Sequence, residues 1–164
     1  MLNNIKAILF HLIYTFLSLI FTVWLVSTGP SLGKFTTSVP GRIFFILLFI
    51  MVYICLGMLL CSNKPKKYDF FFGSLIALVG IVIWLFTFLK TGMNTGVITK
   101  EYGEYWLLFN LFFSPFNSIY FFLDISITPI ILLLSTVFPS LLMGIGLKLK
   151  RRINISTPGG KLKE

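Results

Sequence analysis

The feature that most constrains this chain is a set of four apolar runs, each long enough to cross a lipid bilayer as a helix. The runs cover residues 5–28, 43–61, 70–89 and 125–147. About 20 helical residues span the roughly 30 Å hydrocarbon core of a membrane. Because that core offers no partner to backbone N–H and C=O groups, runs of this length must be helical. We therefore predict an all-α integral membrane protein with about four transmembrane helices.

Composition argues against a water-soluble fold. Hydrophobic residues make up 57% of the chain and charged residues 12%, against about 45–50% and about 25% in soluble domains. A soluble protein of this composition would expose apolar surface that promotes aggregation. We expect residues 1–152 to form a single transmembrane domain and residues 153–164 a flexible cytoplasmic tail.

The basic residues predict the orientation of the chain in the membrane. With both termini in the cytoplasm, ten of the 14 Lys and Arg residues lie inside, which is the bias that membrane proteins show. The four left outside are Lys34, Arg42, Lys90 and Lys100. We predict a multi-pass protein of the cell membrane. An amino-acid composition rich in Phe, Ile and Lys is typical of a bacterial chain.

A basic cluster follows the last apolar run and is made of Lys148, Lys150, Arg151 and Arg152. Close to an anionic leaflet, each basic side chain contributes about 1 kcal/mol of attraction. We expect this cluster to contact anionic lipids at the cytoplasmic face. The net charge of +9 is explained by membrane orientation, so we expect no nucleic-acid partner.

The apolar stretch 105–123 does not fit the four-helix pattern. If it crossed the membrane, the most basic segment of the chain would be exported, against the charge bias. Pro115 removes a backbone donor in mid-segment, and the polar residues Asn110, Ser114 and Asn117 fall on one side of a helix. We predict an interfacial or re-entrant helix pair, broken by proline, in the outer leaflet.

A polar stripe on the first predicted helix is the sharpest pattern in the chain. His11, Thr15, Ser18 and Thr22 step by four, three and four residues, so they share an arc of about 60°. Polar side chains in a membrane face protein, because lipid cannot bond them. We interpret the stripe as a helix-packing seam held by hydrogen bonds. The alternative is the lining of a polar pathway, with His11 changing its protonation.

A second polar group is predicted near the outer surface, where Asn110, Asn117 and Asp124 would share a face if the helix ran on unbroken. Asp124 also precedes the last apolar run, where a carboxylate suits the positive end of a helix dipole. We expect Asp124 to cap that helix. The three residues together form the candidate outer polar patch, for a ligand or a partner.

Residues for the common enzyme chemistries are missing. The chain has one histidine, and His11 is predicted to differ from Asp124 by about 20 Å in membrane depth, which argues against a nucleophilic triad. Cys55 and Cys61 are six helical residues apart, too far for a disulfide with each other. We find no metal-ligand spacing and no phosphate-binding loop. We therefore predict no catalytic, cofactor-binding or metal-binding residue.

These observations predict a non-enzymatic accessory, regulatory or protective membrane factor. It would act by packing its helices against a membrane-protein partner. The alternative is a small transporter or channel subunit that uses the stripe around His11. A homo-oligomer is the other possible assembly, and it would favour the transport alternative. An enzyme with an outer site near Glu101, Glu104 and Asp124 is the least favoured class.

Overall fold

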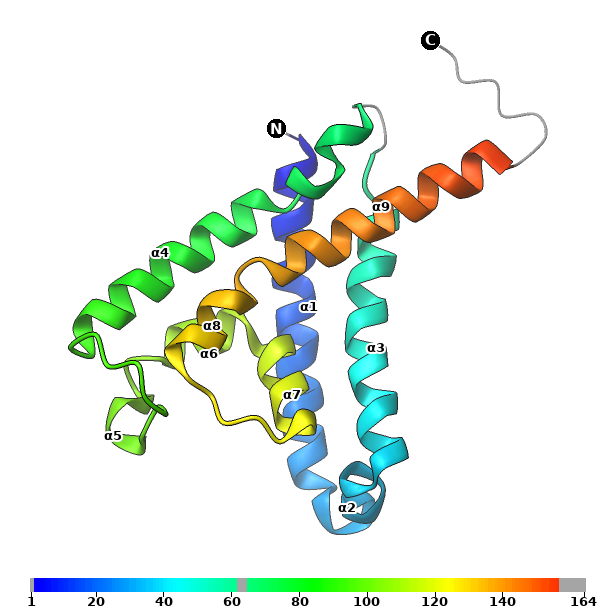
Figure 1. The fold of residues 1–164 in the computed structure, drawn as a ribbon. Coiled ribbons are helices and arrows are strands. Elements are labelled where there is room, and N and C mark those ends of the chain that lie inside the picture. The colour runs from blue at the N-terminus through cyan, green and yellow to red at the C-terminus, as the bar shows by residue number, and fades with distance from the viewer. Residues whose placement is uncertain (1, 62–64, 157–164) are drawn as a thin grey trace.

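The computed structural model describes residues 2–61 and 65–156, and within them all regular secondary structure is helical (Figure 1). In chain order the elements are α1 (Leu2–Ser27), α2 (Gly29–Thr37), α3 (Val39–Met58), the 3-10 helix η1 (Lys66–Phe71), α4 (Ser74–Lys90), α5 (Lys100–Gly103), α6 (Leu107–Phe112), α7 (Ser114–Leu123), α8 (Pro129–Ser135) and α9 (Phe138–Ser156). The predicted all-α class therefore agrees with the structure.

The long helices α1 and α3 run beside each other and are joined by α2 at one end (Figure 1). Helix α9 crosses α3 obliquely near the other end, and α4 slopes away from the bundle. The start of α1, the end of α3, η1 and the end of α9 lie at one end of the molecule, at the top of Figure 1. α2, α5 and the end of α7 lie toward the opposite end. Segments that the charge bias assigns to one side of a membrane thus lie together.

Among the described residues, three helical segments, rather than the predicted four, are long and apolar enough to cross a membrane. They are Asn3–Ser27, Val39–Met58 and Pro129–Ile153. The fourth predicted span is represented by α4, an apolar helix of 17 residues. It begins only at Ser74 because Lys66–Phe71 fold as a separate 3-10 helix. At 1.5 Å per residue, α4 is about 26 Å long, which is shorter than the hydrocarbon core.

The last predicted span, 125–147, is divided between α8 and α9. Pro139 lies in the first turn of α9. It has no N–H to donate to the carbonyl of Ser135, and in a continuous helix its ring would clash with that carbonyl. The helix therefore breaks between Ser135 and Phe138. Helix α9 then continues to Ser156, so the first residues of the predicted flexible tail 153–164 are helical. Residues 157–164 lie outside the described part of the chain.

The stretch 105–123 forms a helix pair that breaks at Phe113. Pro115 causes the break, since it cannot donate to the carbonyl of Leu111. The pair lies against α1, α3 and α4, and most of its aromatic side chains belong to the main hydrophobic core. Phe109 and Phe113 are fully buried. This segment therefore fills the centre of the bundle.

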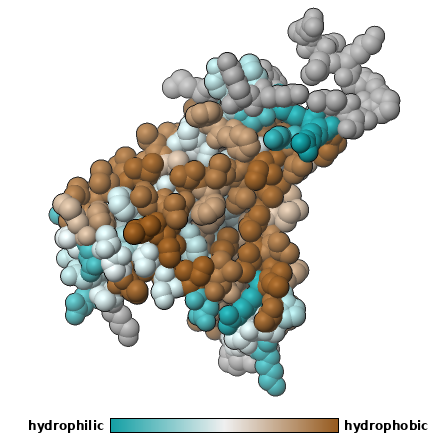
Figure 2. All heavy atoms as spheres, viewed as in Figure 1, coloured by the Kyte–Doolittle hydropathy of each residue, from teal (hydrophilic) through white to brown (hydrophobic). Residues whose placement is uncertain are grey.

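Glycines allow α3 and α9 to approach at backbone distance. A Cβ atom on Gly57 would collide with the carbonyl oxygen of Met143, and one on Gly146 would collide with that of Ile54. Small residues at such crossings are the usual means of close helix packing in membranes. Outside this core, apolar side chains cover the broad middle of the visible surface, and hydrophilic groups gather at its ends (Figure 2).

Candidate functional site

The polar stripe of α1 lies mostly inside the protein. His11 and Ser18 are 0% and 2% exposed and Thr15 is buried, whereas Thr22 is exposed. His11 contacts α3, and Thr15 contacts the α6–α7 pair. Thr22 donates to the carbonyl of Ser18 at 2.9 Å and lies 3.5 Å from the hydroxyl of Ser118 on α7. Three of the four members thus have hydrogen-bond partners in the protein, whereas the buried hydroxyl of Ser18 has none within the described residues. This arrangement favours the packing interpretation.

The break in front of α7 explains why Thr15 is polar. The backbone N–H of Phe116 bonds to Phe113 instead of continuing the α6 ladder, so the carbonyl of Phe112 loses its helical partner. The hydroxyl of Thr15 donates to this carbonyl at 3.0 Å. In return, the hydroxyl of Ser114 donates to the carbonyl of Thr15 at 3.2 Å. An unpaired carbonyl in an apolar interior is costly, and Thr15 removes that cost.

His11 is enclosed by aromatic rings. Its Nδ1 lies 2.8 Å from the hydroxyl of Tyr53 on α3. The rings of Phe112 and Phe113 lie 4.7 and 5.5 Å from the imidazole, measured between centroids. The other ring nitrogen, Nε2, is buried without a hydrogen-bond partner in the described residues. A histidine held in this way joins α1 to α3 and has no exposed surface for exchange with water.

Two of the four residues of the basic cluster of α9 also contact other parts of the chain, and the predicted contact of the cluster with anionic lipids stays a prediction. Lys150 donates to the carbonyl of Leu60 at 2.8 Å, just beyond the end of α3. Arg151 forms an ion pair with Asp69 at 2.9 Å, and the Asp69 side chain is 3% exposed. Lys148 and Arg152 are exposed. The sequence could not show that Asp69 and the end of α3 lie beside α9.

Asp124 ends α7 and does not cap the last helix, so this prediction is wrong. Its backbone is left-handed, with φ of 57°. The N–H of Asp124 bonds to Phe121 and the N–H of Ile125 bonds to Tyr120, which is the Schellman pattern that usually has glycine at the left-handed position. The N-cap of α8 is Thr128, whose hydroxyl accepts from the N–H of Ile131.

A hollow of about 520 Å³ opens beside Asp124. We call it the outer pocket. It lies between α2, the start of α3, the end of α7 and the loop before α8. Its lining residues are Thr36, Thr37, Arg42, Asn117, Tyr120, Phe121, Phe122, Asp124, Ile125, Ser126 and Ile127. Its volume is within the range of ligand sites, about 300–1,000 Å³.

The outer pocket contains two of the three residues of the candidate outer polar patch, Asn117 and Asp124. Asn110 lies outside the lining, although its backbone carbonyl accepts from the Asn117 side chain at 2.9 Å. Sequence reasoning missed Thr36, Thr37 and Arg42 as site residues. The sequence shows that these three residues are polar and follow the first predicted span. It does not show the fold of α2, which brings them to the same pocket as Asp124.

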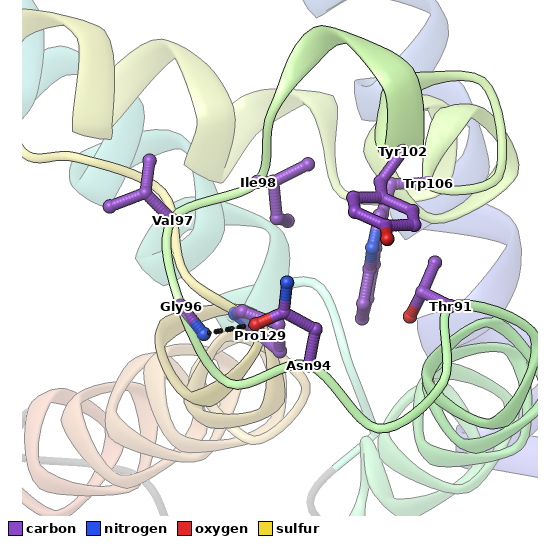
Figure 3. A pocket seen from close by; sticks show the side chains of 8 residues that line it. All are labelled: Thr91, Asn94, Gly96, Val97, Ile98, Tyr102, Trp106 and Pro129. Atoms are coloured by element: carbon purple, nitrogen blue, oxygen red, sulfur yellow. Dashed lines mark hydrogen bonds between the residues drawn. The ribbon is translucent and has the colours of Figure 1, made fainter.

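A smaller cavity between α4, α5 and the loop before α8 is lined by Thr91, Asn94, Gly96, Val97, Ile98, Tyr102, Trp106 and Pro129 (Figure 3). Asn94 closes a turn in its wall by accepting from the N–H of Gly96 at 2.9 Å. The volume of about 10 Å³ is at the lower limit for holding a single water molecule. This cavity is too small for a ligand, and the outer pocket is therefore the candidate site.

In the part of the chain that the structure describes, no three His, Cys, Asp or Glu side chains come together in a way that could hold a metal ion. None of the protein families, curated proteins or solved structures compared with this chain matches it.

Proposed function

We propose that this chain is a non-enzymatic accessory or regulatory membrane protein that acts by packing its helices against a partner membrane protein. The observation that carries the proposal is the position of the α1 stripe. His11, Thr15 and Ser18 are buried and face other helices of the same chain. A transport path would need these polar groups to line a hydrated route, and they lie in a closed seam.

Helix α4 supports a partner-binding role. Its outward face carries exposed apolar side chains at helical spacing, which include Leu78, Val82 and Phe86. A helix shorter than the hydrocarbon core is accommodated by thinning of the bilayer or by association with other proteins. We propose that α4 meets the partner, and that the chain resides in a bacterial cell membrane with both termini in the cytoplasm. The α6–α7 pair would then be re-entrant from the outer side, because its break is buried in protein.

The transport alternative is tested at His11. We expect the wild-type chain in liposomes to show ion flux no greater than empty liposomes. His11→Leu leaves the hydroxyl of Tyr53 without its partner, and it should lower stability in detergent by about 1–3 kcal/mol. The double variant His11→Leu/Tyr53→Phe removes both partners and should recover most of this loss.

The two readouts separate the hypotheses. Packing predicts the stability pattern above and background flux for every variant. Flux by the wild type that His11→Leu abolishes, with stability unchanged, would instead establish the transport function.

A further inference from the structure

The outer pocket holds two opposite charges that the protein itself leaves unpaired. Arg42, half-buried in the first turn of α3, and exposed Asp124, at the end of α7, both line it. Within residues 2–61 and 65–156, neither side chain has an ion-pair or hydrogen-bond partner. A charged group beside an apolar wall gains from a ligand of opposite charge. The pocket therefore has one site for an anion and one for a cation.

The helix dipoles reinforce this separation of charge. Arg42 lies near the N-terminus of α3, a helix of 20 residues, where the dipole favours anions such as phosphate. Asp124 lies at the C-terminus of α7, where the dipole favours cations. Thr36, Thr37 and Asn117 supply further polar atoms to the lining of the pocket. A ligand that carries both a phosphate and an ammonium group matches this lining.

The rest of the lining indicates that such a ligand is a lipid. Phe121, Phe122, Ile125 and Ile127 supply apolar walls, which a free zwitterion would not need. The pocket lies where the apolar helices α1 and α3 end at α2, and hydrophilic groups border the apolar surface there (Figures 1 and 2). Phospholipids place their headgroups at this level of a bilayer.

We propose that the outer pocket binds the headgroup of a zwitterionic phospholipid, with its phosphate at Arg42 and its ammonium at Asp124. The backbone at Asp124 is left-handed, a conformation that Asp and Asn adopt more readily than other non-glycine residues. The assignment therefore depends on the two charges and the lining of the pocket.

The test uses the full chain purified in mild detergent and transferred to nanodiscs, with bound lipid counted by native mass spectrometry. The probes are phosphatidylethanolamine, which has both charges, and phosphatidylglycerol, which lacks the ammonium. We expect the wild type to retain phosphatidylethanolamine about tenfold more strongly. Arg42→Gln should lose retention of both lipids, whereas Arg42→Lys should keep part of it.

Asp124→Asn is the more specific test of the ammonium site, because it removes the charge while asparagine also tolerates the left-handed backbone. We expect it to retain the two lipids equally. Lys34→Gln on α2 and Glu101→Gln on α5 change exposed charges outside the pocket and should behave as the wild type. Equal retention of both lipids by the wild type, or an unchanged preference in Asp124→Asn, would overturn the proposal. Displacement of the lipid by free phosphoethanolamine at equal concentration would overturn the lipid assignment.

Discussion

Replacement of Asp69 by Asn is expected to lower the free energy of unfolding by about 3–5 kcal/mol, the usual cost of removing one partner of a buried ion pair. Asp69 is almost completely buried and lies 2.9 Å from Arg151. It joins η1 to α9 in a part of the chain where α9 also packs on α3. Without the carboxylate, the Arg151 guanidinium keeps its charge in a largely enclosed position. Titration of the protein in detergent with a denaturant, followed by circular dichroism, measures the loss of free energy of unfolding.

A double-mutant cycle tests whether this loss comes from the pair itself. The cycle consists of Asp69→Leu, Arg151→Met and the double variant Asp69→Leu/Arg151→Met, which replaces both charges with apolar groups. We expect the double variant to be more stable than either of these single variants. Glu101→Gln, an exposed carboxylate on α5, is the matched control and should stay within about 0.5 kcal/mol of the wild type. Additive effects of the two single replacements on the free energy of unfolding would show that the two side chains do not stabilise the fold through their interaction.

Gly57→Ala should lower stability by about 1–3 kcal/mol, because overpacking forces backbone to move. The new Cβ would meet the carbonyl oxygen of Met143, and its next neighbours are the Cα and carbonyl carbon of Met143, at 2.7 and 2.8 Å. No flexible side chain is available to move aside. Helices α3 and α9 would have to separate, and thermal unfolding in detergent should show a lower midpoint.

Gly33→Ala is the matched control for this prediction. Gly33 is also helical, in α2, and an added Cβ has no neighbour within 4 Å. Alanine is the better helix former by about 1 kcal/mol, so this variant should be equal to the wild type or slightly more stable. A Gly57→Ala protein as stable as Gly33→Ala would show that α3 and α9 do not pack through Gly57.

The positions of the long helices could be predicted from the sequence because apolar runs ended by Gly and Pro mark them well. The predicted span 5–28 corresponds to α1, Leu2–Ser27, and 43–61 to α3, Val39–Met58. The break at Pro139 was harder to predict, since membrane helices tolerate proline when neighbours satisfy the freed backbone groups. The shortening of α4 depends on η1, and hydropathy does not distinguish a 3-10 helix from an α-helix.

The site could be predicted only where it follows helical periodicity. The α1 stripe shows this, because its spacing depends on one helix alone. Its partners are long-range features that no local pattern reveals, and the carbonyl of Phe112 is an example. The same reason explains the error at Asp124 and the contacts of Lys150 and Arg151 that the sequence did not reveal. Each of these residues is polar at a membrane surface in the sequence, and its role depends on which backbone or charge the fold brings beside it.

The most direct test of partner packing is site-specific photo-crosslinking in the native membrane. A photoreactive residue is placed at Phe86 on α4 and, as the control, at Phe16 on α1; the two side chains are 63% and 64% exposed. The proposed function predicts a crosslink from Phe86 to one different membrane protein, in near-stoichiometric yield, and only lipid adducts from Phe16. No protein adduct at Phe86, or an adduct with a second copy of the chain alone, would contradict an accessory role.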